Sequence, residues 1–438
     1  MKTSSAILLT LLSASWMAAS ELPPLVLPAG VGVNIHFTRG HGGDLDLIAD
    51  AGFKFIRMDF HWASIERKKG EYDWSAYDEL TTNLEKRGIR PLYILDYSNG
   101  RYEDDAVSKN PIGGNEERAT ASPQKPESIA AFADWAAAAA KHFHGRHVVW
   151  EIWNEPNISF WKPKPDVTQY AALALATCRA MRAADPQATI VAPGSSGFPW
   201  PFLETFFKSD AMEYLDAVSV HPYRDYDRGP ETAGEDYLKL RDLLERCAPP
   251  SKKSLPVLCS EWGYASHTKG VPLETQAAFL ARQQLADLLN NVPISIWYDW
   301  MNDGTDPAYN ENNFGVVTND LARKPAYVAV QTLTRQLSGF RISRRLQTAS
   351  EEDFVLLLTN DAGGQKLAAW TVATPHTISL DAGTPAANIS AVDGQGRPLQ
   401  IKDAAGQALA INLQIAPQYL TLKHPSQKLA ATSASPSH

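Results

Sequence analysis

Short apolar segments alternate with longer amphipathic segments from about residue 32 to residue 337. The short segments are rich in Val, Ile, Leu and aromatic residues with few polar interruptions, which is typical of strands that are covered by helices. Such alternation predicts βα units and a parallel sheet. Eight strands are expected, at residues 31–36, 53–59, 90–95, 148–153, 189–193, 217–221, 256–261 and 293–299.

The segments between these strands carry helical signals. Alanine is dense at residues 128–142 and 167–184, residues 273–291 also favour a helix, and a last helix is expected at residues 325–337. Eight strand–helix units predict the α/β fold class, as a closed (β/α)8 TIM barrel over residues 21–337. The connection at residues 96–126 is the long exception, because it is polar and shows little apolar periodicity. Since it follows the third strand, it is expected to lie over the C-terminal face of the barrel, as a substrate-binding loop or as an insertion without a role.

A different rhythm begins after residue 337. Short strands are expected at residues 354–359, 366–372, 377–380 and 419–422, separated by Gly-rich turn signals. This pattern is typical of an antiparallel β-sandwich, and we expect an accessory domain at residues 338–424. Residues 22–27 are expected to pair with the sandwich, and residues 425–438, rich in Ala, Ser and Pro, to form a disordered tail.

The first twenty residues resemble a cleavable export signal. Lys2 precedes an apolar run at residues 6–16 and then a group of small residues, and the run is too short for a membrane span. We therefore expect a signal peptide at residues 1–20 and a secreted or periplasmic protein. No later segment is apolar enough to span a membrane.

Composition and charge exclude several classes of protein. The chain is 44% hydrophobic and 21% charged, as an ordinary globular protein is, and its net charge of −8 argues against nucleic-acid binding. The cysteines Cys178, Cys247 and Cys259 form no CxxC motif, so neither a zinc site nor a disulfide framework is indicated; Cys247 with Cys259 is the one conceivable bridge. No motif requires a metal or an organic cofactor, and none is expected.

Two carboxylates carry the candidate chemistry. Glu155 and Glu261 end the fourth and seventh expected strands, and strands so spaced face each other across a barrel mouth. Hydrolysis of a glycosidic bond requires one carboxylic acid to protonate the leaving oxygen and one carboxylate to attack or to activate water. In retaining enzymes these groups are ~5–5.5 Å apart. A salt-bridging role explains one such glutamate, but two at this spacing favour a glycoside hydrolase.

Three motifs carry a family resemblance: WNEPN at residues 153–157 with FW at 160–161, HPY at 221–223, and SEWG at 260–263. With these motifs the chain resembles the clan A glycoside hydrolases, and within the clan family 39. The resemblance implies that Glu155, after strand four, is the acid/base and that Glu261, on strand seven, is the nucleophile.

Five polar residues are expected to support this pair. Arg57, at the end of strand two, is a candidate for keeping Glu261 ionised, the alternative being a structural pair with Asp59. The resemblance implies that Tyr223 donates a hydrogen bond to Glu261 and that His221 contacts the acid/base or the sugar. Asn154 is expected to bond the sugar 2-hydroxyl. His36 follows strand one and is expected to reach the same pocket.

Aromatic residues near strand ends are candidates for stacking on sugar rings, with core packing as the alternative. They are Trp62, Trp161, Trp262, Trp297 and Trp300. The resemblance favours Trp297, which matches the strand-eight tryptophan of the clan. Asp303 and Glu311, in the polar loop after strand eight, are expected to bind sugar hydroxyls or to cap the loop.

These observations predict a retaining β-glycosidase, similar to β-xylosidases or β-glucosidases, acting on an oligosaccharide or polysaccharide of plant or bacterial origin. The resemblance leaves open an endo-acting hydrolase of a bacterial exopolysaccharide. A carbohydrate-binding barrel without catalysis is a third hypothesis, which the presence of both glutamates disfavours. Sugar, linkage and oligomeric state stay open, because specificity depends on a few polar contacts.

Overall fold

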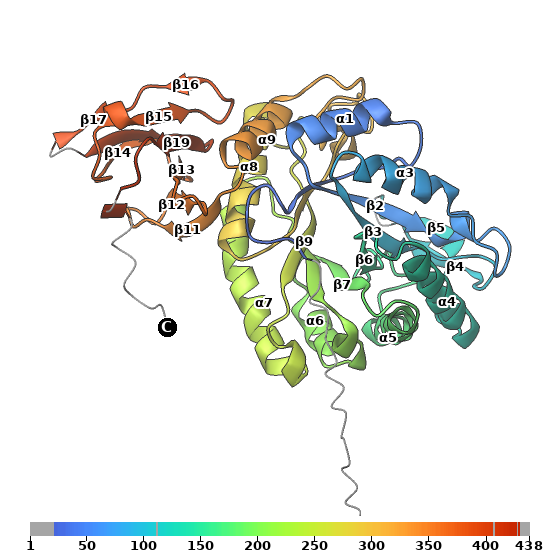
Figure 1. Cartoon of the computed structure of the whole chain (residues 1–438). Helices are drawn as coiled ribbons and strands as arrows, with labels where there is room; N and C mark the ends of the chain where they lie inside the picture. The colour runs from blue at the N-terminus through green and yellow to red at the C-terminus, as the bar shows by residue number, and fades with distance from the viewer. Residues whose placement is uncertain (1–21, 111–112, 406–407, 427, 430–438) are drawn as a thin grey trace, which may run out of the picture.

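Eight parallel strands form a closed barrel, with helices around it (Figure 1). The computed structural model describes residues 22–110, 113–405, 408–426, 428 and 429. Around the barrel the order is β1–β2–β3–β6–β7–β8–β9–β10 and back to β1. These strands are β1 (Val31–Asn34), β2 (Phe55–His61), β3 (Arg90–Asp96), β6 (Val149–Ile152), β7 (Thr189–Ser196), β8 (Ala217–His221), β9 (Val257–Trp262) and β10 (Ser295–Trp297).

Helices surround the barrel, and the four that were expected at residues 128–142, 167–184, 273–291 and 325–337 are present. The α-helices are α1 (Gly42–Ala51), α2 (Trp62–Ile65), α3 (Ser75–Glu85), α4 (Pro126–His142), α5 (Val167–Ala184), α6 (Trp200–Phe207), α7 (Ala233–Cys247), α8 (Leu273–Leu289) and α9 (Pro325–Gln336). The 3-10 helices are η1 (Asp210–Tyr214), η2 (Pro230–Thr232), η3 (Pro250–Lys252), η4 (Asn310–Asn313) and η5 (Ala386–Asn388). Local sequence sets the boundaries: α4 starts at a proline, and Asp166 caps α5 by accepting from the backbone N–H groups of Thr168 and Gln169.

The interior of the barrel is a small apolar core of its own. Alternate residues of a strand point inward, and the apolar inward residues of the strands other than β1, with Ile294 just before β10, form one cluster. Its members are Phe55, Leu92, Ile94, Val149, Val191, Ala217, Leu258, Ile294 and Ile296. The residues between them face outward and pack beneath the helices. The strands are therefore buried on both faces, which explains their continuous apolar sequences.

The C-terminal part consists of two antiparallel sheets, and the predicted fold of a barrel with a β-sandwich is confirmed. One sheet has the order β11–β12–β13–β19–β15–β16 and the other β14–β18–β17. In Figure 1 the sandwich lies beside α8 and α9. Its strands are β11 (Arg341–Arg345), β12 (Asp353–Thr359), β13 (Gln365–Thr371), β14 (His376–Leu380), β15 (Ile389–Val392), β16 (Pro398–Leu399), β17 (Lys402–Asp403), β18 (Leu409–Leu413) and β19 (Gln418–Leu422).

Three expectations about irregular segments require correction. The connection at residues 96–126 contains a hairpin, β4 (Asp105–Lys109) paired with β5 (Glu116–Thr120). Residues 22–27 do not join the sandwich as a strand; Leu27 exchanges backbone hydrogen bonds with the turn before β11, and Leu22 packs against the barrel interior. The expected tail begins as packed chain, since Ser426 and Leu429 are 5% and 4% exposed, with Leu429 in the sandwich core.

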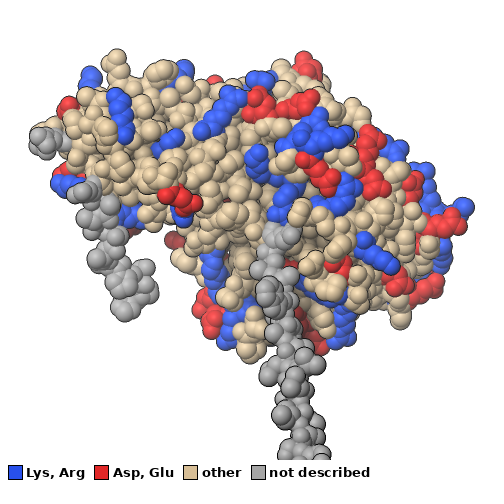
Figure 2. Space-filling view, in the orientation of Figure 1, with Lys and Arg blue, Asp and Glu red and all other residues tan. Residues whose placement is uncertain are grey.

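The remaining predictions concern export, cysteines and charge. The predicted signal peptide and residues 430–438 lie outside the described residues. Among the described helices, none has the length and apolar character to cross a membrane. All three cysteines are free, so the conceivable bridge between Cys247 and Cys259 is absent. Basic and acidic side chains are interspersed over the face of the molecule in Figure 2.

Candidate functional site

A buried ion pair forms the floor of the barrel mouth. Arg57 follows the interior residue Phe55 by two positions on β2, and Glu151 follows Val149 by two positions on β6, so both side chains point inward. They are 1% and 0% exposed. Arg57 donates to Glu151 Oε2 from Nε at 2.9 Å and approaches the same oxygen with Nη2 at 2.8 Å. Hydrogen-bonded pairing of this kind fixes the plane of the guanidinium.

The remaining N–H groups of Arg57 hold residues from other strands. Nη1 donates to Glu261 Oε2 and, at 3.4 Å, to Asn34 Oδ1, while Nη2 donates to Asn154 Oδ1 at 2.8 Å. The contact expected between Arg57 and Glu261 is therefore present. Arg57 forms ion pairs with Glu151 and Glu261. These take the place of the structural pair with Asp59 that was the alternative.

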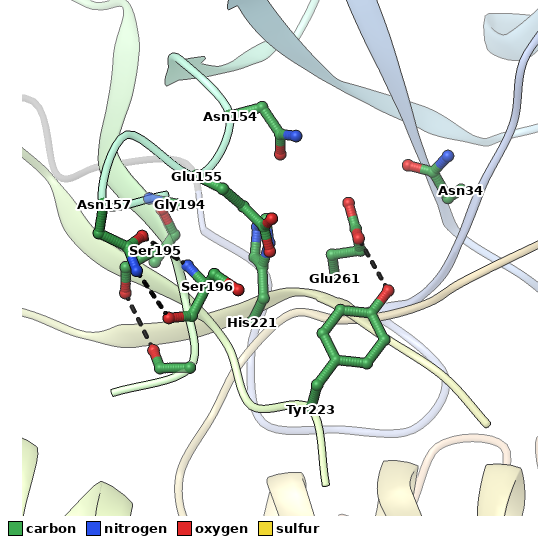
Figure 3. Close-up of polar contacts among 12 residues, drawn as sticks. Asn34, Asn154, Glu155, Asn157, Gly194, Ser195, Ser196, His221, Tyr223 and Glu261 are labelled. Carbon is green, nitrogen blue, oxygen red and sulfur yellow. Dashed lines mark hydrogen bonds and ion pairs between the residues drawn. The ribbon is translucent and has the colours of Figure 1, made fainter. Parts of the chain in front are cut away.

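Glu155 lies in a strained turn directly after β6. Its φ is 47° and that of Trp153 is 68°, values in the left-handed region that cost of order 1–3 kcal/mol per residue. The Glu155 N–H donates to the Gly194 carbonyl at 2.9 Å. Beyond the turn, Asn157 and the Ser196 backbone exchange hydrogen bonds at 2.9 and 2.8 Å (Figure 3). The loop after β7 thus holds the Glu155 turn in place.

His221 connects Glu155 to Arg57. Its Nδ1 lies 2.9 Å from Glu155 Oε1, and its Nε2 lies 3.3 Å from Arg57 Nη2. Because a guanidinium can only donate, Nε2 must act as the acceptor and the proton must reside on Nδ1. The Nδ1–H therefore donates to Glu155 Oε1, which orients that carboxyl group.

An irregularity in β9 turns Glu261 into the mouth. In the pairing with β10, Ser295 lies opposite Cys259 but Trp297 lies opposite Trp262, so β9 contains one extra residue between these pairs. Such a bulge redirects a side chain. Glu261 is 13% exposed at its side chain, whereas the neighbouring Cys259 and Trp262 are fully buried.

Two donors hold the Glu261 carboxylate. Arg57 donates to Oε2, and the Tyr223 hydroxyl donates to Oε1 at 2.8 Å. Figure 3 shows the bond from Tyr223. Burial by itself raises the pKa of Glu261, but the Arg57 charge and the Tyr223 hydrogen bond help to bring the pKa below its ordinary value. Glu261 is therefore ionised at neutral pH, as an attacking group must be.

The two glutamates are close together. One ligand atom each from Glu155, His221 and Glu261 lies within 4.8 Å of the others, so a carboxylate oxygen of Glu155 is no farther than that from one of Glu261. Inverting glycosidases need ~6.5–9.5 Å to admit a water, while retaining ones need ~5–5.5 Å. The observed spacing fits the retaining geometry.

A second polar group lies beside Glu261, at the ends of β1 and β10. His36 Nε2 is 3.5 Å from Asp299 Oδ2. Burial lowers the pKa of His36, but the hydrogen bond and charge of Asp299 outweigh it and raise the pKa to about 9. An oxygen of Asp303 lies within 4.8 Å of both, and burial, Asp303 and Glu261 raise the pKa of Glu311. The ligand atoms of His36, Asp299 and Asp303 are close enough together to hold a cation. The ion pair between His36 and Asp299 explains the same arrangement without one.

The tryptophans that we expected to stack on sugar do not line the mouth. All five are at most 1% exposed and lie in the core: Trp62, Trp161, Trp262, Trp297 and Trp300. The indole N–H of Trp300 donates to Asp44 Oδ1 at 2.9 Å. A ring without exposed surface offers no face to a ligand, so the stacking prediction is wrong and the core-packing alternative holds.

From β10 the aromatic side chain that reaches the mouth is Tyr298 rather than Trp297. Ile296 points into the barrel and Trp297 toward the helices, so alternation brings Tyr298 inward again. Tyr298 is partly exposed and lies edge-on to His36, with 5.7 Å between ring centroids. The family resemblance had pointed to Trp297, one residue before the side chain that faces the mouth. Counting alternate positions from Ile296 identifies Tyr298 instead.

The sequence analysis also missed the polar ends of β2 and β3. Asp96 is fully buried, and burial together with the neighbouring Asp59 raises its pKa well above the ordinary value. The His61 ring lies 3.5 Å from Asp59 and 3.6 Å from Asp96. Tyr97, which directly follows Asp96, accepts a hydrogen bond at its hydroxyl from Asn154 Nδ2 at 3.0 Å. The connection at residues 96–126 therefore borders the site at its first residues.

Comparison with known proteins identifies the class of enzyme. Residues 32–305, more than half of the chain, match the family model for cellulase (glycosyl hydrolase family 5). The search of curated proteins gives no match. A solved family 39 glycoside hydrolase from the gut symbiont Bacteroides cellulosilyticus is 27% identical, over 92% of this chain and 83% of that one, with a TM-score of 0.76.

Two further solved structures show the same fold at lower identity. A family 39 β-xylosidase from Caulobacter crescentus is 18% identical, covers 93% of this chain and 98% of its own, and has a TM-score of 0.63. A glucosidase from Croceicoccus marinus is 16% identical, with coverage of 91% and 96% and a TM-score of 0.63. The chain belongs to the clan A glycoside hydrolases, through its match to the cellulase family (glycosyl hydrolase family 5) and its likeness to family 39, and is a retaining O-glycosyl hydrolase.

Proposed function

We propose that this hydrolase is a β-glycosidase acting on a plant or bacterial glycan, with β-xylosidase-like or β-glucosidase-like specificity. The observation that carries the proposal is the pair Glu155 and Glu261, within 4.8 Å of each other and held by different partners. The β-xylosidase and glucosidase among the structural neighbours support the choice of sugars.

In the first step Glu261 attacks the anomeric carbon and the bond from that carbon to the leaving oxygen breaks. Glu155 transfers its proton to that oxygen, so the aglycone departs as a neutral alcohol. The product is a glycosyl ester on Glu261. Its carboxylate is suited to attack because Arg57 and Tyr223 hold it ionised and oriented.

In the second step Glu155, now a carboxylate, removes a proton from water. The resulting hydroxide adds to the anomeric carbon as the ester bond to Glu261 breaks, and the original configuration is restored. His221 keeps one Glu155 oxygen engaged at 2.9 Å, so the other is available to the leaving group and then to the water. Asn154, fixed by Arg57 and Tyr97, is assigned to the sugar 2-hydroxyl.

We also propose that the protein is exported to the periplasm or secreted. The basis is residues 1–20, with their apolar run and small residues before the expected cleavage site. Mass spectrometry of the mature N-terminus from culture fractions tests it, and an intact Met1 in the cytoplasmic fraction contradicts it.

The roles of the two glutamates are tested by azide rescue. Glu155→Ala with an activated aryl β-glycoside still forms the ester, and azide, which needs no general base, should release a β-glycosyl azide. Glu261→Ala cannot form the ester, so azide should attack the opposite face and give an α-glycosyl azide. Glu311→Ala is the matched control for loss of a mouth carboxylate and should give no azide product. Exchanged anomers would reverse the two roles.

Specificity is tested separately with nitrophenyl β-xylosides, β-glucosides and other β-glycosides beside polysaccharides. The proposal predicts the highest kcat/KM on a β-xyloside or a β-glucoside. Cleavage confined to internal bonds of a polysaccharide, with no aryl glycoside turned over, contradicts it.

A further inference from the structure

The sandwich holds a loop of the barrel through one carboxylate, Glu231, which lies in η2 after β8. Glu231 Oε1 accepts hydrogen bonds from Trp370 Nε1 and from Arg282 Nε, both at 2.7 Å, and Oε2 accepts from Arg282 Nη2 at 2.6 Å. The side chains of Glu231 and Arg282 are 8% and 3% exposed, and Trp370 is fully buried. Charge-assisted bonds that are shielded from water are strong and directional.

The sandwich fixes the direction of the indole N–H. Trp370, on β13, lies directly opposite Phe354 on β12, and the two rings stack at 5.0 Å with an 8° interplanar angle. The Arg345 guanidinium covers Phe354 at 3.8 Å from the ring centroid. Since both strands belong to the six-stranded sheet, the donor is as rigid as the sheet itself.

From Glu231 the contacts continue to the catalytic site. The next residue, Thr232, accepts a hydrogen bond at its Oγ1 from Arg224 Nε at 3.2 Å. Arg224 directly follows Tyr223, and its guanidinium lies 5.9 Å from the ring of Trp262, the residue after Glu261. Arg224 therefore connects the segment that Glu231 anchors to Tyr223, its neighbour in the chain, and to Trp262, the neighbour of Glu261.

We propose that Trp370 is a positioning residue for the hydrolytic reaction, and that the sandwich keeps the loop at residues 222–232 in the place where Tyr223 reaches Glu261. The inference rests on the proposed roles of Tyr223 and Glu261. A displacement of about 1 Å in a catalytic arrangement can cost on the order of a hundredfold in rate, so a remote anchor of this kind has measurable effects.

The test is Trp370→Phe in the full-length enzyme, a change that keeps a ring on Phe354 but removes the indole donor. We expect kcat to fall about tenfold with a smaller change in KM. The acidic limb of the kcat/KM profile should move to higher pH, because Glu261 loses part of the hydrogen bond that lowers its pKa. In a Tyr223→Phe background the same substitution should have little further effect, since residues that act as one unit are not additive.

Gln395→Leu is the matched control. It removes another bond between sandwich and barrel, from Gln395 Nε2 to the Pro325 carbonyl at 3.2 Å, at the start of α9. It should lower Tm without moving the pH profile. If Trp370→Phe does not fold, Thr232→Val cuts the same route inside the barrel and should give the same shift.

An unchanged pH profile in Trp370→Phe or in Thr232→Val, or full additivity with Tyr223→Phe, overturns the inference. Failure of the proposed function looks different, because Glu261→Ala and Tyr223→Phe would then keep wild-type activity.

Discussion

Removal of the Tyr223 hydroxyl is the most informative change at the site. Tyr223→Phe leaves the ring but deletes the donor that lies 2.8 Å from Glu261 Oε1, while Arg57 still contacts Oε2. A hydrogen bond to a charged group is worth about 1.5–3 kcal/mol. Because about 1.4 kcal/mol is a factor of ten in an equilibrium constant, ionisation of Glu261 should become roughly ten- to a hundredfold less favourable, and its pKa should rise. The sign is upward, since the lost bond favours the ionised carboxylate.

The assay is the pH dependence of kcat/KM on an aryl β-glycoside. The acidic limb reports the ionisation of Glu261 in the free enzyme, so this limb should move upward in the variant while the basic limb stays in place. At the pH optimum kcat should also fall about ten- to a hundredfold, because the nucleophile is less well oriented. An acidic limb that does not move, or a basic limb that moves instead, refutes the assignment of Tyr223 to Glu261.

Three further predictions concern the surroundings of the site. Trp300→Phe leaves Asp44 without its indole partner and should cost about 1–3 kcal/mol in a urea-unfolding measurement with kcat unchanged; a large kcat loss at unchanged stability contradicts a core role. The hydrogen bond and charge of Asp299 outweigh burial and raise the pKa of His36 from 6.5 to about 9, while burial raises the pKa of Asp299 from 3.8 to about 7. Both groups therefore hold their protons more tightly in the folded state, and the charged pair itself is complete only between about pH 7 and pH 9. The stability that the His36 proton contributes is present below pH 6.5 and is lost as pH rises through about 9. Unfolding measured from pH 6 to 10 should show this loss in the wild type but not in Asp299→Asn. Replacing residues 106–119, the β4–β5 hairpin, by a short turn should alter KM or product length more than Tm, and kinetics unchanged on every substrate contradict a binding role for the hairpin.

The sequence predicted the barrel well because its strands are covered on both faces and therefore read as continuous apolar runs. The same burial explains the tryptophan error. Trp297 lies on a strand whose inward positions are even-numbered, and motif matching does not register which face a residue occupies. Tyr298 could be found by alternation alone, once Ile296 is assigned to the interior.

Long-range polar contacts were harder to predict. Glu151 lies within an apolar strand, and its partner Arg57 is distant in sequence but on the same inward level of the barrel. The clue was a charge in the middle of a buried strand, which requires an opposite charge nearby. The bond from Trp370 to Glu231 had no sequence signal, because it depends on how the sandwich docks against the barrel.

The central claim is that Glu261 becomes covalently attached to the sugar. A 2-deoxy-2-fluoro β-glycoside with a good leaving group should form this ester and hydrolyse it slowly, so the adduct can be digested and sequenced by mass spectrometry. The account predicts one labelled peptide, with the fluorosugar on Glu261 and with slow recovery of activity after the reagent is removed. A label on Glu155, or inversion of the anomeric configuration without any adduct, would contradict it.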